Sequence, residues 1–169
     1  MDLTTLAEST ARPTLRFVYS HPAHFISFGF GLGLIPVAPG TFGTLLALPI
    51  QIWLVSRMGE QALAVLIPLL FALGVWACQV TGKALRVHDH SGMVWDETVA
   101  FLIVLFFTPA SPMWQAFAFL AFRVFDILKP TPIRYVDRTI RNGFGVMFDD
   151  LLAAFYTLLC LAAWKLLFG

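Results

Sequence analysis

Apolar residues form long runs along the chain, and short polar segments separate them. Four runs cover about residues 61–81, 94–108, 112–128 and 146–168. A fifth, residues 25–55, contains several glycines and prolines, which interrupt regular helices. Its second part, about residues 41–55, is expected to be a helix, and its first part an entry loop or a half-helix. The pattern therefore predicts about five apolar helices, with a Gly/Pro loop that breaks the first segment.

The composition indicates that these runs lie in a membrane. Hydrophobic residues make up 59% of the chain and charged residues only 12%, about half the usual ~25%. The run 61–81 is long enough to cross about 30 Å of hydrocarbon. The runs 94–108 and 112–128 are short, so we expect them to be tilted, shielded or folded as a hairpin. The sequence predicts an all-α integral membrane protein, a bundle of about five membrane helices.

The first 24 residues differ from the rest of the chain. Residues 1–24 are polar and are expected to form an N-terminal arm before a membrane-embedded domain at 25–169. No small-residue cleavage site follows an apolar run there, so we expect no removable signal peptide. Cys78 and Cys160 lie inside apolar runs and are expected to be small hydrophobic residues rather than a disulfide or metal pair.

With five membrane-spanning helices, the charged residues would be divided unevenly between the two sides of the membrane. All of the 11 lysine and arginine residues except Arg57 and Lys165 fall on the face with the N-terminus and the loops 82–95 and 129–145. The positive-inside rule predicts that this face is cytoplasmic. All of the ten acidic residues except Glu60 share it. Since acidic residues contribute little to orientation, their position needs another explanation.

Three acidic groups lie where apolar runs meet this interface: Asp96 with Glu97, Asp126, and Asp149 with Asp150. Ionisable groups at such a depth are costly and indicate a function. Five carboxylates would repel one another unless a cation holds them, and oxygen ligands suit Mg²⁺ or Mn²⁺. The alternative is that they cap helix N-termini or pair with arginines. That alternative fits Asp126 poorly, because an acid near a helix C-terminus opposes the dipole.

Groups suited to an anion accompany these acids. The Gly/Pro segment 33–44 leads into a helix start, where the backbone N–H of Gly40 and the hydroxyls of Thr41 and Thr44 predict a phosphate site. The alternative is a plain helix start with Thr41 as N-cap. Lys129 and Arg134 place cations beside Asp126; alternatively, they are interfacial anchors. The segment 88–90, His-Asp-His, is a weaker metal candidate because it has no third ligand.

Four segments carry these groups in a fixed order: PVAPGTFGT at 36–44, WDE at 95–97, FDILKPTPIR at 125–134 with Asp137 and Arg138, and GFGVMFDDLLA at 143–153. Together they resemble the bacterial phosphatidylglycerophosphatase A family over about residues 25–168. The chain has alanine at positions 100 and 154, where glycine is usual in the family pattern. This difference affects close helix packing and removes no ligand.

The resemblance implies a Mg²⁺-dependent enzyme of the bacterial inner membrane, with residues 25–169 as its catalytic domain and its active site facing the cytoplasm. Its substrate would be the phospholipid phosphatidylglycerophosphate, whose terminal phosphate monoester is hydrolysed to give phosphatidylglycerol and phosphate. No nucleic-acid partner is expected. The implied site residues are Thr41, Asp96, Glu97, Asp126, Lys129, Arg134, Asp149 and Asp150.

A mechanism follows as a hypothesis. The carboxylates at 96, 97, 149 and 150, with Asp126 as a further ligand, would hold one or two Mg²⁺. Lys129, Arg134 and the backbone at 40–41 would hold the phosphoryl oxygens. Asp126 would accept the proton of the attacking water, although direct attack by an aspartate stays open.

Two other classes of protein compete with this interpretation. A small transporter or channel with a carboxylate cation site would suit buried acids and a broken helix. Its site would normally lie at mid-membrane, however, whereas these charges lie at one interface. A non-catalytic membrane protein that binds anionic lipids would explain the basic loops but not the acids.

Overall fold

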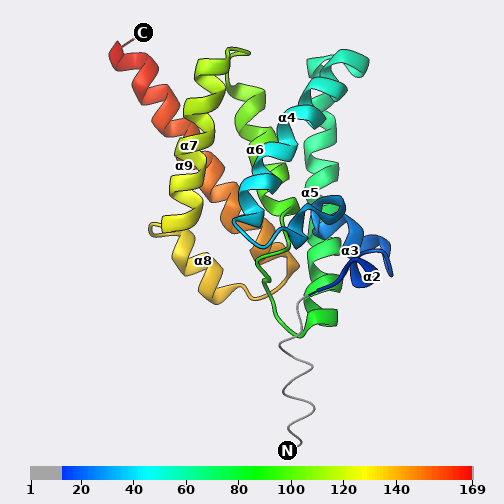
Figure 1. Ribbon diagram of the computed structural model, residues 1–169. Coiled ribbons are helices and arrows are strands. Elements are labelled where there is room, and N and C mark those ends of the chain that lie inside the picture. The colour runs from blue at the N-terminus through cyan, green and yellow to red at the C-terminus, as the bar shows by residue number, and fades with distance from the viewer. Residues whose placement is uncertain (1–12, 169) are drawn as a thin grey trace, which may run out of the picture.

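The computed structural model describes residues 13–168, and the predicted all-α class is confirmed because this part of the chain contains helices and no strand (Figure 1). The elements are α2 (Leu15–Val18), α3 (Pro22–Ser27), the 3₁₀ helix η1 (Gly29–Leu34), α4 (Pro39–Met58), α5 (Glu60–Leu85), α6 (Trp95–Phe107), α7 (Pro112–Leu128), α8 (Ile133–Thr139) and α9 (Gly143–Phe168).

Five long helices correspond to the five apolar runs of the sequence. Three of them, α4, α5 and α9, are long and apolar enough to cross a membrane. The other two are shorter, with 13 residues in α6 and 17 in α7. At 1.5 Å per residue, α6 is about 20 Å long, less than the hydrocarbon thickness. The number of membrane-spanning helices therefore stays a prediction.

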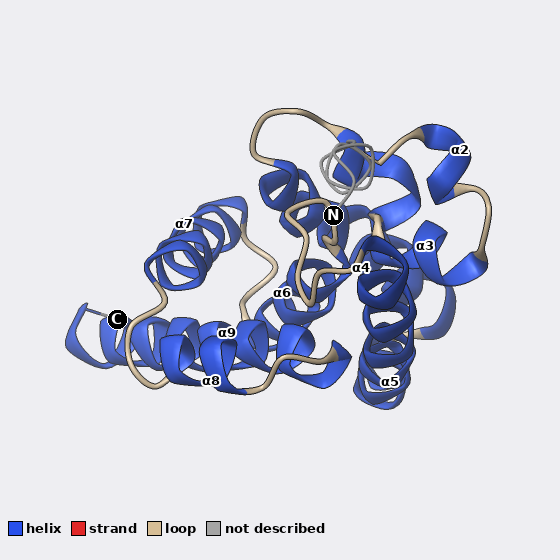
Figure 2. Ribbon diagram, turned by 90° about the horizontal axis from the view of Figure 1, so that it is seen from below, coloured by secondary structure: helices blue, strands red, loops and turns tan. Residues whose placement is uncertain are grey.

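Helix α6 lies in the middle of the bundle. It packs against α4, α5, α9 and, less extensively, α7, and the view from below places it between these helices (Figure 2). Most of its side chains are buried, among them Phe101, Leu102, Val104 and Leu105. A helix enclosed on all sides is apolar all round, which explains the composition of this run. Ala100 and Ala154 are buried in the same core cluster.

The segment before α4 has an unusual backbone. Phe30 and Gly31 have positive φ angles of 62° and 106° inside η1, and Ala38 has a φ of 48° immediately before the helix. Helix α4 begins at Pro39, whose fixed φ suits the first helical position, and Ala38 is its N-cap. The alternative of Thr41 as N-cap is therefore wrong, because Thr41 already lies in the first turn.

The N-terminal part of the described chain packs on the bundle. Residues 1–12 of the expected arm lie outside the described residues, and the expected boundary at residue 24 falls inside α3. His24 is buried, and its Nδ1 lies 3.0 Å from Oγ1 of Thr81 on α5. The division into an arm and a domain stays a prediction.

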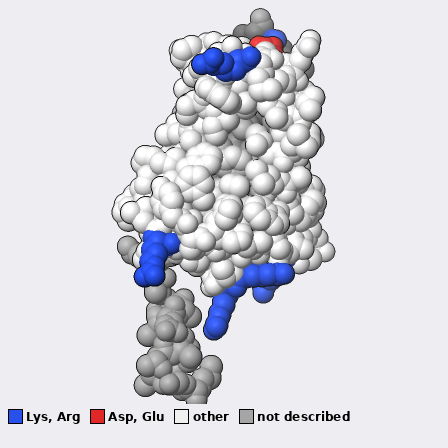
Figure 3. Space-filling view, turned by 90° about the vertical axis from the view of Figure 1, so that its right-hand side faces the viewer, with Lys and Arg blue, Asp and Glu red and all other residues white. Residues whose placement is uncertain are grey.

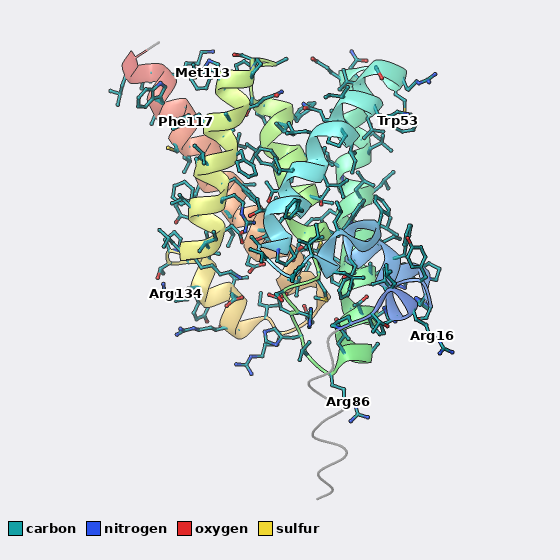
Figure 4. The ribbon with its side chains drawn as sticks, in the orientation of Figure 1. Arg16, Trp53, Arg86, Met113, Phe117 and Arg134 are labelled. Atoms are coloured by element: carbon teal, nitrogen blue, oxygen red, sulfur yellow. The ribbon has the colours of Figure 1, made fainter. Side chains whose placement is uncertain are left out.

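Charged side chains lie toward the two ends of the molecule. Figure 3 shows lysine and arginine side chains at both ends of one face, with a wide uncharged surface between them. Arg16, Arg86 and Arg134 lie toward one end of the bundle, and Trp53 and Met113 lie toward the other (Figure 4). This arrangement is typical of a protein whose middle part contacts lipid.

Candidate active site

The three acidic groups of the sequence meet near one end of the bundle. Asp96 and Glu97 lie in the first turn of α6, Asp126 lies in the last turn of α7, and Asp149 and Asp150 lie early in α9. All five carboxylates line one cavity of about 250 Å³. Its other lining residues are Asp89, Ser91, Met93, Ile127 and Lys129.

Asp96, Glu97 and Asp150 form the core of this acidic site. One carboxylate oxygen from each lies within 4.8 Å of those of the other two. The second oxygen of Glu97, Oε2, is buried and has no hydrogen-bond partner. A buried polar atom without a hydrogen-bond partner is costly, and carboxylate oxygens are ligands for hard cations. These three residues can therefore hold a metal ion.

The other two predicted carboxylates have cationic partners. Oδ2 of Asp126 accepts a hydrogen bond from Nη1 of Arg123 at 2.6 Å. Oδ2 of Asp149 accepts one from Nζ of Lys129 at 2.5 Å, and the same ammonium donates to Oδ1 of Asp137 at 2.8 Å. The structure thus places Asp96, Glu97 and Asp150 in one group, whereas Asp126 and Asp149 each accept a hydrogen bond from a cationic side chain.

Lys129 reaches the cavity from the end of α7. It is the C-cap residue of that helix, with a left-handed backbone at φ 44°. Burial alone would lower the pKa of Lys129, but the charge of Asp149 and the hydrogen bonds with Asp137 and Asp149 outweigh burial and raise the pKa above its ordinary value. The side chain is therefore a permanent cation among carboxylates.

Arg123 is the site residue that the sequence analysis missed, since it counted this arginine only toward the charge of one face. Besides the pair with Asp126, Nη1 lies 3.3 Å from Oγ1 of Thr44 and 3.6 Å from Oε1 of Glu97. Nε of Arg123 is buried without a partner. The available signal was an arginine three residues before an acid inside an apolar run, a spacing that places both on one helix face.

Gly40 contributes to the site by having no side chain. A Cβ at this position would lie 2.0 Å from Oε1 of Glu97. The first turn of α4 can therefore lie directly against the carboxylate at the start of α6. The sequence analysis predicted only that the backbone N–H of Gly40 contacts phosphate. Nothing in the structure tests that contact.

The other predicted phosphate contacts lie outside the cavity lining. Thr44 is buried, and its hydroxyl donates to the carbonyl of Gly40 at 2.8 Å. Thr41 is partly buried near the same turn. Arg134 is exposed at the outer edge of the bundle, where Nη2 donates to the carbonyl of Leu128 at 3.1 Å (Figure 4). Of the predicted phosphate contacts, only Lys129 lines the cavity.

The segment 88–90 does not gather around one centre. Asp89 lines the acidic cavity, whereas His88 lines a separate one between the end of α5 and the start of α9. Nδ1 of His90 accepts a hydrogen bond from the backbone N–H of Gly92 at 2.9 Å. Asp89 is thus a sixth acid at the site, and the sequence analysis considered it only within this weaker motif.

The described residues 13–168 thus form an all-helical structure. Three of its helices are long and apolar enough to cross a membrane, and its group of three carboxylates can hold a metal ion. The sequence model of the family described as phosphatidylglycerophosphatase A matches residues 25–165. The chain therefore belongs to this family.

Three relatives of known name are similar over most of their length. A Haemophilus influenzae protein named phosphatidylglycerophosphatase A is 44% identical over 152 residues, which cover 89% of this chain and 93% of the relative. An Escherichia coli protein of the same name is 40% identical over 139 residues, covering 82% and 80%. A Bacteroides thetaiotaomicron protein with the provisional name phosphatidylinositol-3-phosphatase is 37% identical over 151 residues, covering 85% and 94%. No solved structure shows significant similarity to the chain.

Proposed function

We propose that the protein hydrolyses the terminal phosphate monoester of phosphatidylglycerophosphate to give phosphatidylglycerol and phosphate. The names of two relatives that are 44% and 40% identical support this activity. The observation that carries the proposal is the buried group of Asp96, Glu97 and Asp150, with one carboxylate oxygen left unpartnered. The names of the relatives favour an enzyme over a transporter or channel.

The proposed cofactor is Mg²⁺. All donors of the three-membered group are carboxylate oxygens, the ligand type that Mg²⁺ prefers. Asp96, Glu97 and Asp150 would hold the ion, and Asp126 and Asp149 are candidates for further contacts from their ion-paired positions. When bound, Mg²⁺ would neutralise phosphate charge and lower the pKa of a coordinated water.

The protein's own residues supply the remaining functions. Lys129, held by Asp149 and Asp137, is proposed to bind a phosphoryl oxygen at the cavity wall. Asp126, oriented by Arg123, is proposed as the base that accepts a proton from water. Contacts of Gly40, Thr41, Thr44 and Arg134 with phosphate stay predictions, and the cavity lining gives them no support.

The proposed location is the bacterial inner membrane, with residues 25–169 as the catalytic domain and the acidic cavity on the cytoplasmic side. Headgroup phosphates lie at the bilayer surface, so an enzyme that acts on them needs its polar residues at the end of the bundle. The asymmetry of basic residues in the sequence supports the cytoplasmic side.

The decisive experiment is phosphate release by the purified protein in detergent micelles, first with Mg²⁺ and then with EDTA. Phosphatidylglycerophosphate and phosphatidylinositol 3-phosphate are compared, because a relative carries the second lipid in its name. We expect release from the first lipid, loss of release in EDTA, and recovery when Mg²⁺ is restored. Release that survives EDTA would contradict the metal mechanism, and a preference for the inositol lipid would overturn the substrate.

A further inference from the structure

The acidic cavity has two exposed rims of opposite character. Its inner wall consists of the partly buried Glu97 and the buried residues Met93, Asp96, Asp126, Asp149 and Asp150. Asp89 and Ser91, on the loop before α6, form an exposed polar rim. Ile127, on α7, lines the same cavity although 67% of the residue is exposed. One rim is therefore suited to water and the other to apolar groups.

Ile127 also lies at one end of an exposed apolar face of α7. Leu120, Val124 and Ile127 are all exposed, and their spacing of four and three residues places them along one face of the helix. The opposite face, with Phe122 and Asp126, is buried. At 1.5 Å per residue, the exposed face from Leu120 to Ile127 is about 10 Å long. It leads from the apolar middle of the bundle directly to the cavity wall.

We infer that the phospholipid substrate reaches the cavity sideways from the bilayer along α7, and that Ile127 contacts the first acyl carbons. This inference rests on the proposed function, since it concerns how a lipid phosphate is presented to the carboxylates. The terminal phosphate would lie inside the cavity beside Lys129, and the acyl chains would stay against the face of Leu120, Val124 and Ile127.

The chemistry of the two rims supports this orientation. A phospholipid has a charged end and an apolar end; the cavity offers Lys129 to the phosphate and the rim at Ile127 to the apolar end. An acyl chain that stays on an exposed helix face does not need to leave the bilayer, so binding does not expose its apolar surface to water. Contact with Ile127 removes apolar area from the remaining water at the interface, which favours the acylated substrate over a free headgroup.

Kinetics with two substrates test the inference. The lipid is dioleoyl phosphatidylglycerophosphate in mixed micelles, and the soluble probe is its deacylated headgroup, glycerophosphoglycerophosphate. The variants are Ile127→Ser, which removes the apolar contact, and Ile127→Val, which keeps most of it. Ile52→Ser is the matched control, because Ile52 is 68% exposed on α4 and does not line the cavity. Thermal unfolding of each variant checks folding.

We expect Ile127→Ser to lower kcat/KM for the lipid about five- to tenfold, mainly through KM, and to leave kcat/KM for the soluble probe unchanged. Ile127→Val and Ile52→Ser should stay within about twofold of the unsubstituted protein on both substrates. Equal losses on the two substrates, or an equal loss in Ile52→Ser, would overturn the inference, as would no loss in Ile127→Ser. If the unsubstituted protein releases phosphate from neither substrate, the proposed function itself fails.

Discussion

Arg123 and Asp126 form an ion pair on α7 with 2.6 Å between Nη1 and Oδ2. The same nitrogen lies 3.3 Å from Oγ1 of Thr44 on α4 and 3.6 Å from Oε1 of Glu97 on α6. The Arg123 guanidinium therefore connects α7, which carries Asp126, with α6, which carries Glu97, and with the first turns of α4, which carry Gly40 and Thr44. It holds Asp126 in one orientation without being a candidate metal ligand itself.

Replacing Arg123 should therefore lower turnover more than metal affinity. A hydrogen bond to a charged group contributes about 1.5–3 kcal/mol, and each 1.36 kcal/mol of barrier is about tenfold in rate. We expect Arg123→Gln to lower kcat about 10- to 100-fold and to change the half-saturating Mg²⁺ concentration by less than about threefold. Arg123→Lys should be intermediate, because lysine keeps the charge but not the planar donor geometry. An unchanged kcat would show that Asp126 does not need this partner.

The adjacent residues Asp149 and Asp150 should respond differently to the same substitution. Asp150 belongs to the group of three acids, whereas Asp149 is paired with Lys129. A bound ion stabilises the folded state by mass action, so the shift in unfolding midpoint on adding Mg²⁺ reports binding. Asp150→Asn should abolish this shift. Asp149→Asn should keep most of the shift. It should, however, lower the unfolding midpoint measured without Mg²⁺, because Lys129 loses one of its two carboxylate partners. Identical behaviour of the two variants would contradict the division of the site.

The helix positions were the most predictable part of the fold. The run 112–128 coincides with α7, which begins at Pro112 and ends one residue before Lys129. Proline and charge delimit apolar runs sharply, so these limits are local properties of the sequence. Helix α8 was missed inside the expected loop 129–145. A seven-residue helix has little intrinsic stability and depends on tertiary packing, in this case against α9.

The carboxylates of the site were predictable for a different reason. An acid at the end of an apolar run is conspicuous, and helices of one bundle bring their ends to common levels. The roles of Arg123 and Gly40 were not predictable, because each depends on a contact with Glu97, which is 26 residues from the first and 57 from the second. A glycine at the start of a helix also has a local explanation, and only the packed structure shows the close approach of Gly40 to Glu97.

Gly40→Ala should impair activity with little effect on folding. The new Cβ would lie 2.0 Å from Oε1 of Glu97, and a carboxylate at the end of a flexible side chain can move away. Glu97 would then leave its place beside Asp96 and Asp150. We expect kcat to fall at least about tenfold, as for other misplaced catalytic groups, with an almost unchanged unfolding midpoint.

Gly43→Ala is the matched control for Gly40→Ala. Its Cβ would lie 2.7 Å from the carbonyl oxygen of Val94 and 2.6 Å from Cβ of that residue. Backbone cannot move as easily as a side-chain end, so the start of α6 would be displaced and the unfolding midpoint should fall clearly. A larger loss of stability in Gly40→Ala than in Gly43→Ala would show that Glu97 is rigidly fixed.

The stability contributed by Lys129 should not change between neutral and mildly alkaline pH. Its pKa is raised above the ordinary value because the attraction of Asp149 and the hydrogen bonds with Asp137 and Asp149 outweigh burial. A raised pKa means that the contribution is fully present below the ordinary value of about 10.4 and is lost only as pH rises through the higher folded value. Lysine free of such partners would begin to lose its charge earlier.

The unfolding midpoints of the unsubstituted protein and of Lys129→Gln at pH 7 and pH 9 measure this contribution. We expect Lys129→Gln to unfold at a lower temperature, because Asp149 is left buried without its cation. The difference between the two proteins should be the same at both pH values. Lys83→Gln, at an exposed lysine in the last turn of α5, should show almost no difference at either. If the difference for Lys129→Gln were smaller at pH 9, the ammonium would already be losing its proton, and the ion pairs with Asp149 and Asp137 would be weaker than their distances indicate.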